Sequence, residues 1–311
     1  MIYLVPPLPV KNRYTEDWIK VWERELKKLG KSYVVVGSKK VESLTMFFTN
    51  PQKALIYECK QIEFLAKTKV DKLLCLDIDF PGLITSAIQV LRLTNPDLVA
   101  YGYLHAGSWC NGDIFKSTAG KSFVERAMFD TFDKIFVATN YHKQKIERYF
   151  GKEFKNLEVV GYPFYKEDIL RYANSHQKKS IILISGRPEQ SDMGLVDRIK
   201  KKFSKEKIIV NPKCKTRKDY FQLLSKAKIF ISLKTEETFG LSVLEACTLG
   251  TLVLCPNLYS YPEILKNEFL LYENGDDLLS RLENLLRLRH VEGFVDLEEY
   301  RQTIFRIVKD L

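Results

Sequence analysis

The chain has 311 residues, 45% of them hydrophobic and 28% charged, which is enough for one large domain or two ordinary ones with buried cores. No apolar run approaches the roughly 18 residues of a membrane helix. The proline-rich start is too short for a signal peptide, and the six cysteines lack CxxC or zinc-like spacing, so we expect a cytoplasmic protein with reduced thiols. The net charge of +10 favours anionic partners such as phosphates, nucleic acid or an acidic membrane face.

The first half of the chain alternates short apolar runs with stretches of helical spacing. Several runs are nearly continuous Val, Ile and Leu, which is typical of strands buried on both faces of a parallel sheet. The predicted strands are residues 2–5, 33–36, 72–76, 98–104, 134–138 and 157–160, and predicted helices include 18–29 and 123–132.

The second half repeats this alternation after a break at Gly161 and Pro163 and a polar stretch up to Ser180. The repeated strand–helix order predicts an α/β fold of two Rossmann-like, doubly wound parallel-sheet domains that face a central cleft. We place the first domain at 1–165, completed by an amphipathic helix at 296–311, and the second at 166–295. The predicted strands of the second domain are 180–185, 207–210, 228–233, 251–255 and 269–272, with helices over 220–227, 241–249 and 278–288.

The stretch KTEETFGLSVLEACTLGTLVLCPN, residues 234–257, places two acids around the start of an apolar helix. Ligands of open α/β sheets bind beyond the carboxyl ends of the strands, so this helix N-terminus can hold a phosphate or diphosphate. Gly240 lets the backbone approach such a ligand. Glu245 is near enough for a ribose, and Glu237 can face the other end of the ligand. One alternative stays open, because Ser242 and Glu245 have the spacing of a capping box.

Residues 236–265, EETFGLSVLEACTLGTLVLCPNLYSYPEIL, resemble the C-terminal signature of GT-B glycosyltransferases in the large family-4-like retaining group. The resemblance implies that Glu237 contacts the donor sugar and that Glu245 binds the nucleotide ribose. It also implies that the amides near Leu241 and Ser242 hold the diphosphate, next to Phe239 and Gly240. The implied donor is a nucleotide-diphosphate sugar, with a UDP-sugar favoured, and no further cofactor.

A second match lies upstream, in SIILISGRPEQSDMG. It is similar to the family's strand that ends in Gly-Arg, which implies that Arg187 meets the donor phosphates. The lysine that the family usually carries a few residues later is missing here. Lys213 or Lys215, in the basic stretch NPKCKTRKDY, could replace it, although both are equally compatible with solvated loop lysines.

The first half departs further from the family. VPPLPVKNRYTEDW has no glycine where the family carries a glycine-rich loop, so we expect Lys11 and Arg13 to supply cationic contacts instead. GYLHAGSW matches better, because a strand that ends in histidine is common there and implies that His105 faces the reacting sugar. KIFVATNYHKQKI resembles a strand that ends in Ser or Thr near the acceptor, which points to Thr139. We expect His142 to be a surface residue of the following helix.

LDIDFPG contains Asp77 and Asp79 as a DxD motif. DxD holds a divalent metal in the other main glycosyltransferase fold, GT-A, but the complete GT-B signature lies elsewhere in this chain, so we expect no metal. One of the two acids, Asp79 above all, can instead orient an acceptor hydroxyl as part of the catalytic site. Helix capping or a solvated loop charge remains an alternative for both.

The acceptor is the least determined part. The compact layout looks like glycosyltransferases that phages encode, some of which modify hydroxymethylated bases in DNA. The basic charge suits double-stranded DNA, and Trp109 is one of several aromatic residues beside basic ones that could hold a flipped base. Two alternatives remain, a glycosyltransferase for cell-surface glycan or lipid-linked sugar, and a non-catalytic protein that binds nucleotide sugars or nucleic acid. The sequence does not determine the oligomeric state.

Overall fold

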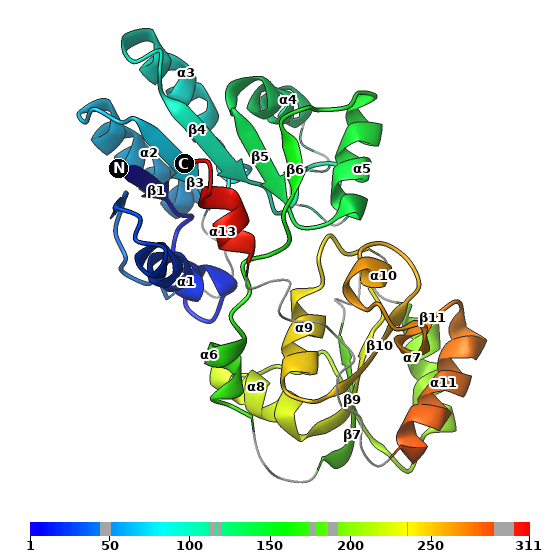
Figure 1. The fold of residues 1–311 in the computed structure, drawn as a ribbon. Coiled ribbons are helices and arrows are strands. Elements are labelled where there is room, and N and C mark those ends of the chain that lie inside the picture. Colours follow the sequence, from blue (N-terminus) through cyan, green and yellow to red (C-terminus); the bar gives the residue numbers. More distant parts are fainter. Residues whose placement is uncertain are drawn as a thin grey trace. The chain divides into compact units, whose positions relative to one another are not determined.

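The computed structural model describes residues 1–43, 51–111, 113, 116, 118, 120–173, 178–185, 192–234, 236–288 and 302–311. The chain divides into two compact units. The first unit contains Met1–Pro163 and Gln302–Leu311, and the second contains Phe164–Arg301 (Figure 1). No helix in the described residues is both long and apolar enough to cross a membrane.

The first unit is built on a six-stranded sheet whose paired strands are all parallel. The strand order is β2-β1-β3-β4-β5-β6, so the direction of winding reverses between β1 and β3. The strands are β1 (Ile2–Val5), β2 (Tyr33–Val35), β3 (Lys72–Cys75), β4 (Val99–Tyr103), β5 (Lys134–Val137) and β6 (Leu157–Val159).

Helices cover this sheet through apolar contacts. One buried cluster joins residues of the sheet to four helices, α2 (Pro51–Ala66), α3 (Ile84–Thr94), α4 (Lys121–Thr131) and α5 (Asn140–Phe150). Helix α1 (Tyr14–Lys28) packs against α13 (Thr303–Val308), near the C-terminus (Figure 1). An ion pair also attaches the C-terminal segment to the sheet, since the Asp310 carboxylate lies 2.7 Å from the Lys134 ammonium at the start of β5.

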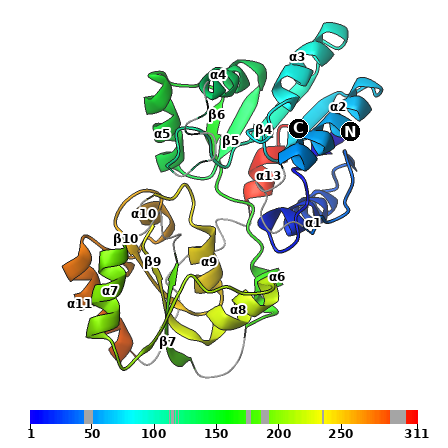
Figure 2. The same ribbon diagram turned by 180° about the vertical axis from the view of Figure 1, so that it is seen from behind.

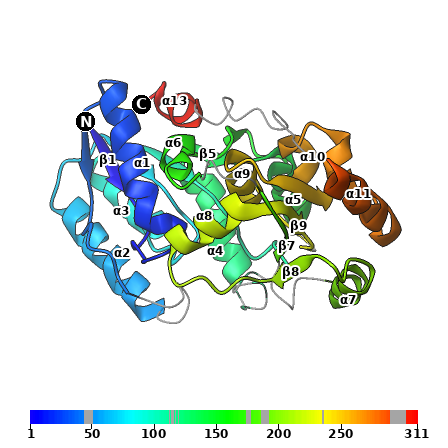
Figure 3. The same ribbon diagram turned by 90° about the horizontal axis from the view of Figure 1, so that it is seen from below.

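The second unit is a five-stranded parallel sheet in the order β11-β10-β9-β7-β8, and its winding reverses between β7 and β9. Figures 2 and 3 show α7 (Met193–Lys202) and α11 (Gly275–Arg287) on one face of the sheet, and α6 (Lys166–Leu170), α8 (Arg217–Lys226) and α9 (Leu241–Thr248) on the other. The strands are β7 (Lys179–Ser185), β8 (Lys207–Val210), β9 (Ala227–Ser232), β10 (Leu252–Pro256) and β11 (Leu271–Tyr272).

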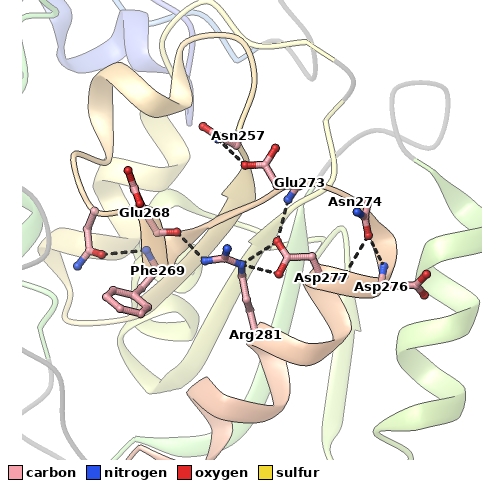
Figure 4. Close-up of polar contacts among 9 residues, drawn as sticks. Asn257, Glu268, Phe269, Glu273, Asn274, Asp276, Asp277 and Arg281 are labelled. Atoms are coloured by element: carbon pink, nitrogen blue, oxygen red, sulfur yellow. Dashed lines mark hydrogen bonds and ion pairs between the residues drawn. The ribbon is translucent and has the colours of Figure 1, made fainter.

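A polar network fixes the carboxyl ends of β10 and β11 to the start of α11 (Figure 4). Asn274 caps α11 by accepting from the amides of Asp276 and Asp277 at 3.0 and 3.1 Å. Arg281 donates to both carboxylate oxygens of Asp277 at 2.8 Å and to the backbone carbonyl of Glu268 at 2.7 Å. The Glu268 carbonyl belongs to the 3₁₀ turn η3 (Glu268–Leu270), which follows the short helix α10 (Tyr261–Ile264), so Arg281 links α11 to η3.

The expectation of two Rossmann-like parallel sheets is confirmed, while several helix boundaries were wrong. Helices α1, α4, α8 and α11 begin two to four residues earlier than the apolar pattern predicted, because most residues of their first turns are polar and precede that pattern. Helix α8 is the clearest case, since Thr216 and Asp219 form a full capping box at its start. The segment 269–272 was expected to be a strand, but η3 forms its first two residues and only Leu271–Tyr272 pair with the sheet.

Candidate functional site

The loop between β9 and α9 lies where a ligand is expected in the second unit. Strand β9 is one of the two neighbouring strands between which the winding of the sheet reverses, and open α/β sheets bind ligands at the carboxyl ends of such strands. The other strand, β7, leads directly to residues 186–191, so Arg187 lies outside the described residues and its role stays a prediction. The described part of the candidate donor site is therefore Lys234, residues 236–245 and the groups that contact them.

Glu237 forms an ion pair with Lys234, three residues earlier in the same loop. Its carboxylate also accepts from its neighbour's amide, that of Thr238, at 3.1 Å. Burial acts to raise the pKa of Glu237, but the Lys234 ammonium and the amides of Phe239 and Gly240 outweigh burial and hold this pKa below its ordinary value. Glu237 is therefore an ionised carboxylate of fixed orientation, which can accept hydrogen bonds from hydroxyl groups.

Gly240 shapes the start of α9. Its φ of 87° lies in the left-handed region that favours glycine, and a β-carbon there would lie 3.3 Å from both Ile264 and Tyr261. Among the described residues, no side chain caps this N-terminus. The backbone amides that begin at Leu241 and Ser242 thus form the positive end of the helix, as an anion site requires.

Glu245 is held by a second cation. Only 4% of it is exposed, and its carboxylate accepts from Arg217 at 3.1 Å. Burial raises the pKa of Glu245, and the Arg217 guanidinium opposes that rise. The capping-box alternative is wrong, because α9 begins at Leu241 and Ser242 lies inside the helix rather than before it.

The two glutamates pair with cations that the sequence analysis did not name. Arg217 pairs with Glu245 and Lys234 with Glu237, and both cations were missed. Lys213 and Lys215 are exposed and belong to neither ion pair, and their role as phosphate ligands stays a prediction. Arg217 begins a helix rather than continuing a basic loop, a change that the Thr216–Asp219 capping spacing could have revealed. Lys234 had a simpler signal, its spacing of three from Glu237.

Replacing Lys234 should change the pH dependence of activity. In Lys234→Met, burial acts on Glu237 without the opposing ammonium, so the pKa of Glu237 rises. If the ionised carboxylate is the form that contacts the substrate, activity should fall at a higher pH on the acidic side than in the wild type. Lys234→Arg should restore the wild-type profile, and Lys215→Met should leave it unchanged. A Lys234→Met profile with an unmoved acidic limb would show that Lys234 does not control this carboxylate.

In the first unit, His105 lies in an aromatic cluster beyond the end of β4. Its ring centroid is 4.8 to 5.7 Å from the rings of Tyr14, Trp18, Tyr103 and Tyr162. Its Nε2 lies 3.1 Å from the carbonyl of Leu76. Burial lowers the pKa of His105 to about 4, although that carbonyl opposes the shift. His105 is therefore a neutral imidazole near pH 7. Its Nε2–H donates to the Leu76 carbonyl, so as an active-site residue it would offer Nδ1 as a hydrogen-bond acceptor and would not act as a cation.

Asp77 and Asp79 follow β3 and differ in their surroundings. Asp79 is buried against Lys121 of α4, whose ammonium lies 2.8 Å from the Asp79 carboxylate and 2.9 Å from its carbonyl oxygen. Burial raises the pKa of Asp79 to about 7, and Lys121 opposes that rise. Burial, together with the charge of Asp79, also raises the pKa of Asp77. The reading of Asp79 as a solvated or helix-capping charge is wrong, since it forms a buried ion pair.

Asp79→Asn should destabilise the fold without affecting the nucleotide site. The substitution replaces the contact with Lys121 by a weaker neutral hydrogen bond, a loss of about 1–3 kcal/mol in the free energy of unfolding. A larger loss is not expected, because the raised pKa of Asp79 means that burial already disfavours its ionised form. In the wild type, Asp79 binds a proton in the folded chain between its ordinary pKa of 3.8 and about 7, so its contribution to stability is lost as the pH rises through that window. This dependence should disappear in Asp79→Asn. Urea unfolding at several pH values measures both effects, and weaker nucleotide binding would contradict the separation.

The remaining acceptor-side residues are mostly structural. Thr139 is buried and caps α5 by accepting from the amide of His142 at 3.2 Å. His142 was expected on the surface, which was wrong, since it is 1% exposed and accepts from the indole of Trp109 at 3.1 Å. Lys11 is exposed and Arg13 is the residue before α1. The acceptor roles of all five candidates, with Asp77 as the fifth, stay predictions.

No three His, Cys, Asp or Glu side chains in the described part of the chain are grouped as metal ligands would be.

Comparison with known proteins agrees with this geometry. Residues 169–302 match the family described as Glycosyl transferases group 1. This range contains β7, the two glutamates of the β9–α9 region and both of their paired cations.

Several solved structures have a similar fold over nearly the whole chain. A sucrose-phosphate synthase (tll1590) from Thermosynechococcus elongatus is 11% identical, with a TM-score of 0.62 over 98% of this chain and 94% of that one. The catalytic domain of starch synthase IV from Arabidopsis thaliana, bound to ADP and acarbose, is 8% identical, with a TM-score of 0.63 over 98% and 94%. A glycosyltransferase from Rickettsia africae ESF-5 is 16% identical, with a TM-score of 0.57 over 98% and 93%. The second unit thus carries a glycosyl transferases group 1 domain, and the chain has the GT-B fold of glycosyltransferases.

Proposed function

We propose that the protein transfers a sugar from a nucleotide-diphosphate donor, preferably a UDP-sugar, to an acceptor hydroxyl with retention at the anomeric carbon. The observation that carries this proposal is the pair of ion-paired glutamates around the uncapped start of α9, within a group 1 domain. Glu245 is assigned to the ribose, the α9 amides to the diphosphate and Glu237 to the sugar hydroxyls.

The arrangement suits the charges that the reaction develops. Cleavage of the anomeric C–O bond places negative charge on the departing diphosphate and positive charge on the sugar ring. The positive end of α9 opposes the first charge, with Arg187 as a second group in this proposal, and the ionised Glu237 opposes the second. Because Glu237 and the start of α9 are held by the fold before the substrate arrives, they stabilise the transition state without reorganising.

We further propose that transfer needs no divalent metal, because fixed cations and amides supply the stabilisation that a metal would give. Activity should survive EDTA. Loss of turnover on chelation, with recovery on adding manganese, would contradict this proposal and would favour Asp77 and Asp79 as metal ligands.

For the acceptor, the net charge of +10 favours an anion, and we propose a hydroxymethylated base of duplex DNA as the first candidate. If several lysines neutralise phosphates, the logarithm of the affinity should fall linearly with that of the salt concentration, with a slope of about −0.9 per phosphate. Lys11→Ala and Arg13→Ala should then weaken DNA binding and reduce that slope. Salt-independent binding would contradict the proposal.

Product analysis tests the reaction as a whole. The protein is incubated with a panel of nucleotide sugars and with hydroxymethylated DNA, a saccharide or a lipid acceptor, and the acceptor mass and anomeric configuration are measured. A sugar-mass gain with the donor's configuration supports retaining transfer. A mass gain on the saccharide or lipid alone would identify that molecule, and not DNA, as the acceptor. No mass gain with any donor–acceptor pair would contradict the proposed reaction.

A further inference from the structure

The first unit contains a cavity of about 260 Å³ between α5 and the loop that follows β4. Five of its lining residues come from α5 at spacings of three, four and seven or eight, so they share one face of that helix. Aromatic rings and cations line the cavity, and none of its described lining residues is acidic: Trp109, Tyr141, Gln144, Lys145, Arg148 and Tyr149.

The Trp109 side of the cavity is fixed by buried hydrogen bonds. Trp109 is 5% exposed, and its indole N–H donates to His142 Nε2 at 3.1 Å. The loop is held one residue earlier, where the amide of Ser108 donates to the buried carboxylate of Glu125 on α4 at 2.6 Å. The ring cannot turn without breaking these contacts, so this wall exists before any ligand arrives, as in most small-molecule sites.

The charge of the cavity points to an anion. Lys145 and Arg148 lie one helical turn apart, and the Lys145 ammonium is 5.9 Å from the centre of the Tyr141 ring. The nearest acid on the same helix, Glu147, is engaged elsewhere, since it accepts from the amide of Phe154 at 3.2 Å. Ammonium and guanidinium groups bind phosphate oxygens through charge-assisted hydrogen bonds.

The aromatic rings and the volume of the cavity further restrict the chemical class of the ligand. Trp109 and Tyr149 lie with their centroids 6.2 Å apart, and such rings pack against the flat face of a sugar or base. The volume is just below the range of about 300–1,000 Å³ typical of drug-sized ligands, which suits a single unit. We propose that this cavity binds one phosphorylated sugar unit of the acceptor, with its phosphate on Lys145 and Arg148 and its ring against Trp109 and Tyr149. This inference rests on the proposed glycosyl transfer.

Binding to the whole chain tests the inference. Hexose 6-phosphate, a deoxynucleoside monophosphate, unphosphorylated hexose and inorganic phosphate are titrated by calorimetry and by tryptophan fluorescence. We expect one of the two phosphorylated sugars to bind at least ten times more tightly than hexose or phosphate alone. A preference for the hexose phosphate indicates a saccharide source, and a preference for the nucleotide indicates a nucleic acid. Equal binding of unphosphorylated hexose would overturn the proposal.

Variants locate the site. The double variant Lys145→Ala, Arg148→Ala should bind the preferred phosphorylated sugar at least tenfold more weakly than the wild type. Lys155→Ala, which removes an exposed lysine outside the cavity, should leave this affinity unchanged. Trp109→Phe should remove the fluorescence change, because the other two tryptophans, Trp18 and Trp22, are buried on α1. UDP binding, measured in the same variants, should be unchanged. If the wild type does not bind UDP, the donor proposal alone is refuted. If the double variant binds the phosphorylated sugar as tightly as the wild type, the proposed cavity site is refuted.

Discussion

Glu237→Gln should reduce the rate of sugar transfer by roughly 10²–10³-fold, the magnitude seen when one preorganised electrostatic contact is removed from a transition state. The amide keeps the shape of the side chain but lacks the negative charge that opposes the cationic sugar ring. The effect should therefore appear in kcat, with little change in nucleotide affinity. Steady-state kinetics with a saturating acceptor measures both.

Glu236 provides the matched control for this variant. It lies one residue earlier in the same loop and carries the same charge, so Glu236→Gln changes the net charge equally without removing the carboxylate paired with Lys234. It should retain near-wild-type turnover. Equal losses in the two variants would show that the charge of the loop matters, rather than the position of Glu237.

Glu245→Ala should weaken nucleotide binding by about 1–3 kcal/mol, the cost of leaving buried polar partners unsatisfied. In the proposed complex these partners are the ribose hydroxyls and Arg217, whose guanidinium lies 3.1 Å from the Glu245 carboxylate. Calorimetric titration with the nucleotide product measures the loss. The substitution should lower kcat much less than Glu237→Gln does.

Two further variants separate binding from folding. Arg217→Met should also weaken nucleotide binding. Without Arg217, the Glu245 carboxylate is no longer held in its orientation and stays buried without that guanidinium. Glu245→Gln should keep most of the stability while losing the charged contact. If Glu245→Ala lowers only the melting temperature and leaves nucleotide affinity intact, Glu245 serves α8–α9 packing alone.

Much of the fold could be predicted from the sequence because most of its strands are buried on both faces. Runs such as TLVLC and KIFISL have few polar residues, so their identity as strands does not depend on distant contacts. Helix starts were harder, since their first turns contain caps and charges. The order of strands in each sheet could not be predicted, because it depends on which apolar faces meet after the chain has folded.

The candidate site was predicted unevenly for the same reason. Glu237, Gly240 and Glu245 are close in sequence, so their spacing carries the signal. Arg217 is 28 residues from Glu245 and reaches it only through the packing of α8 on α9.

The prediction that His142 lies on the surface failed because a mostly polar helix was expected to be exposed on all sides. Its helix is mostly polar, and yet His142 and Ile146 are both buried one turn apart. This i, i+4 spacing was a usable signal for the buried face.

The most direct test of the proposed reaction is nucleotide release from a panel of nucleotide-diphosphate sugars, followed without and with acceptor in the wild type and in Glu237→Gln. We expect slow release from one donor, faster release when acceptor is added, and a loss of at least about 10²-fold in Glu237→Gln despite unchanged nucleotide affinity. The proposed reaction would be contradicted if the wild type binds nucleotide but releases none from any donor, which would indicate a binding protein, or if Glu237→Gln releases nucleotide as fast as the wild type.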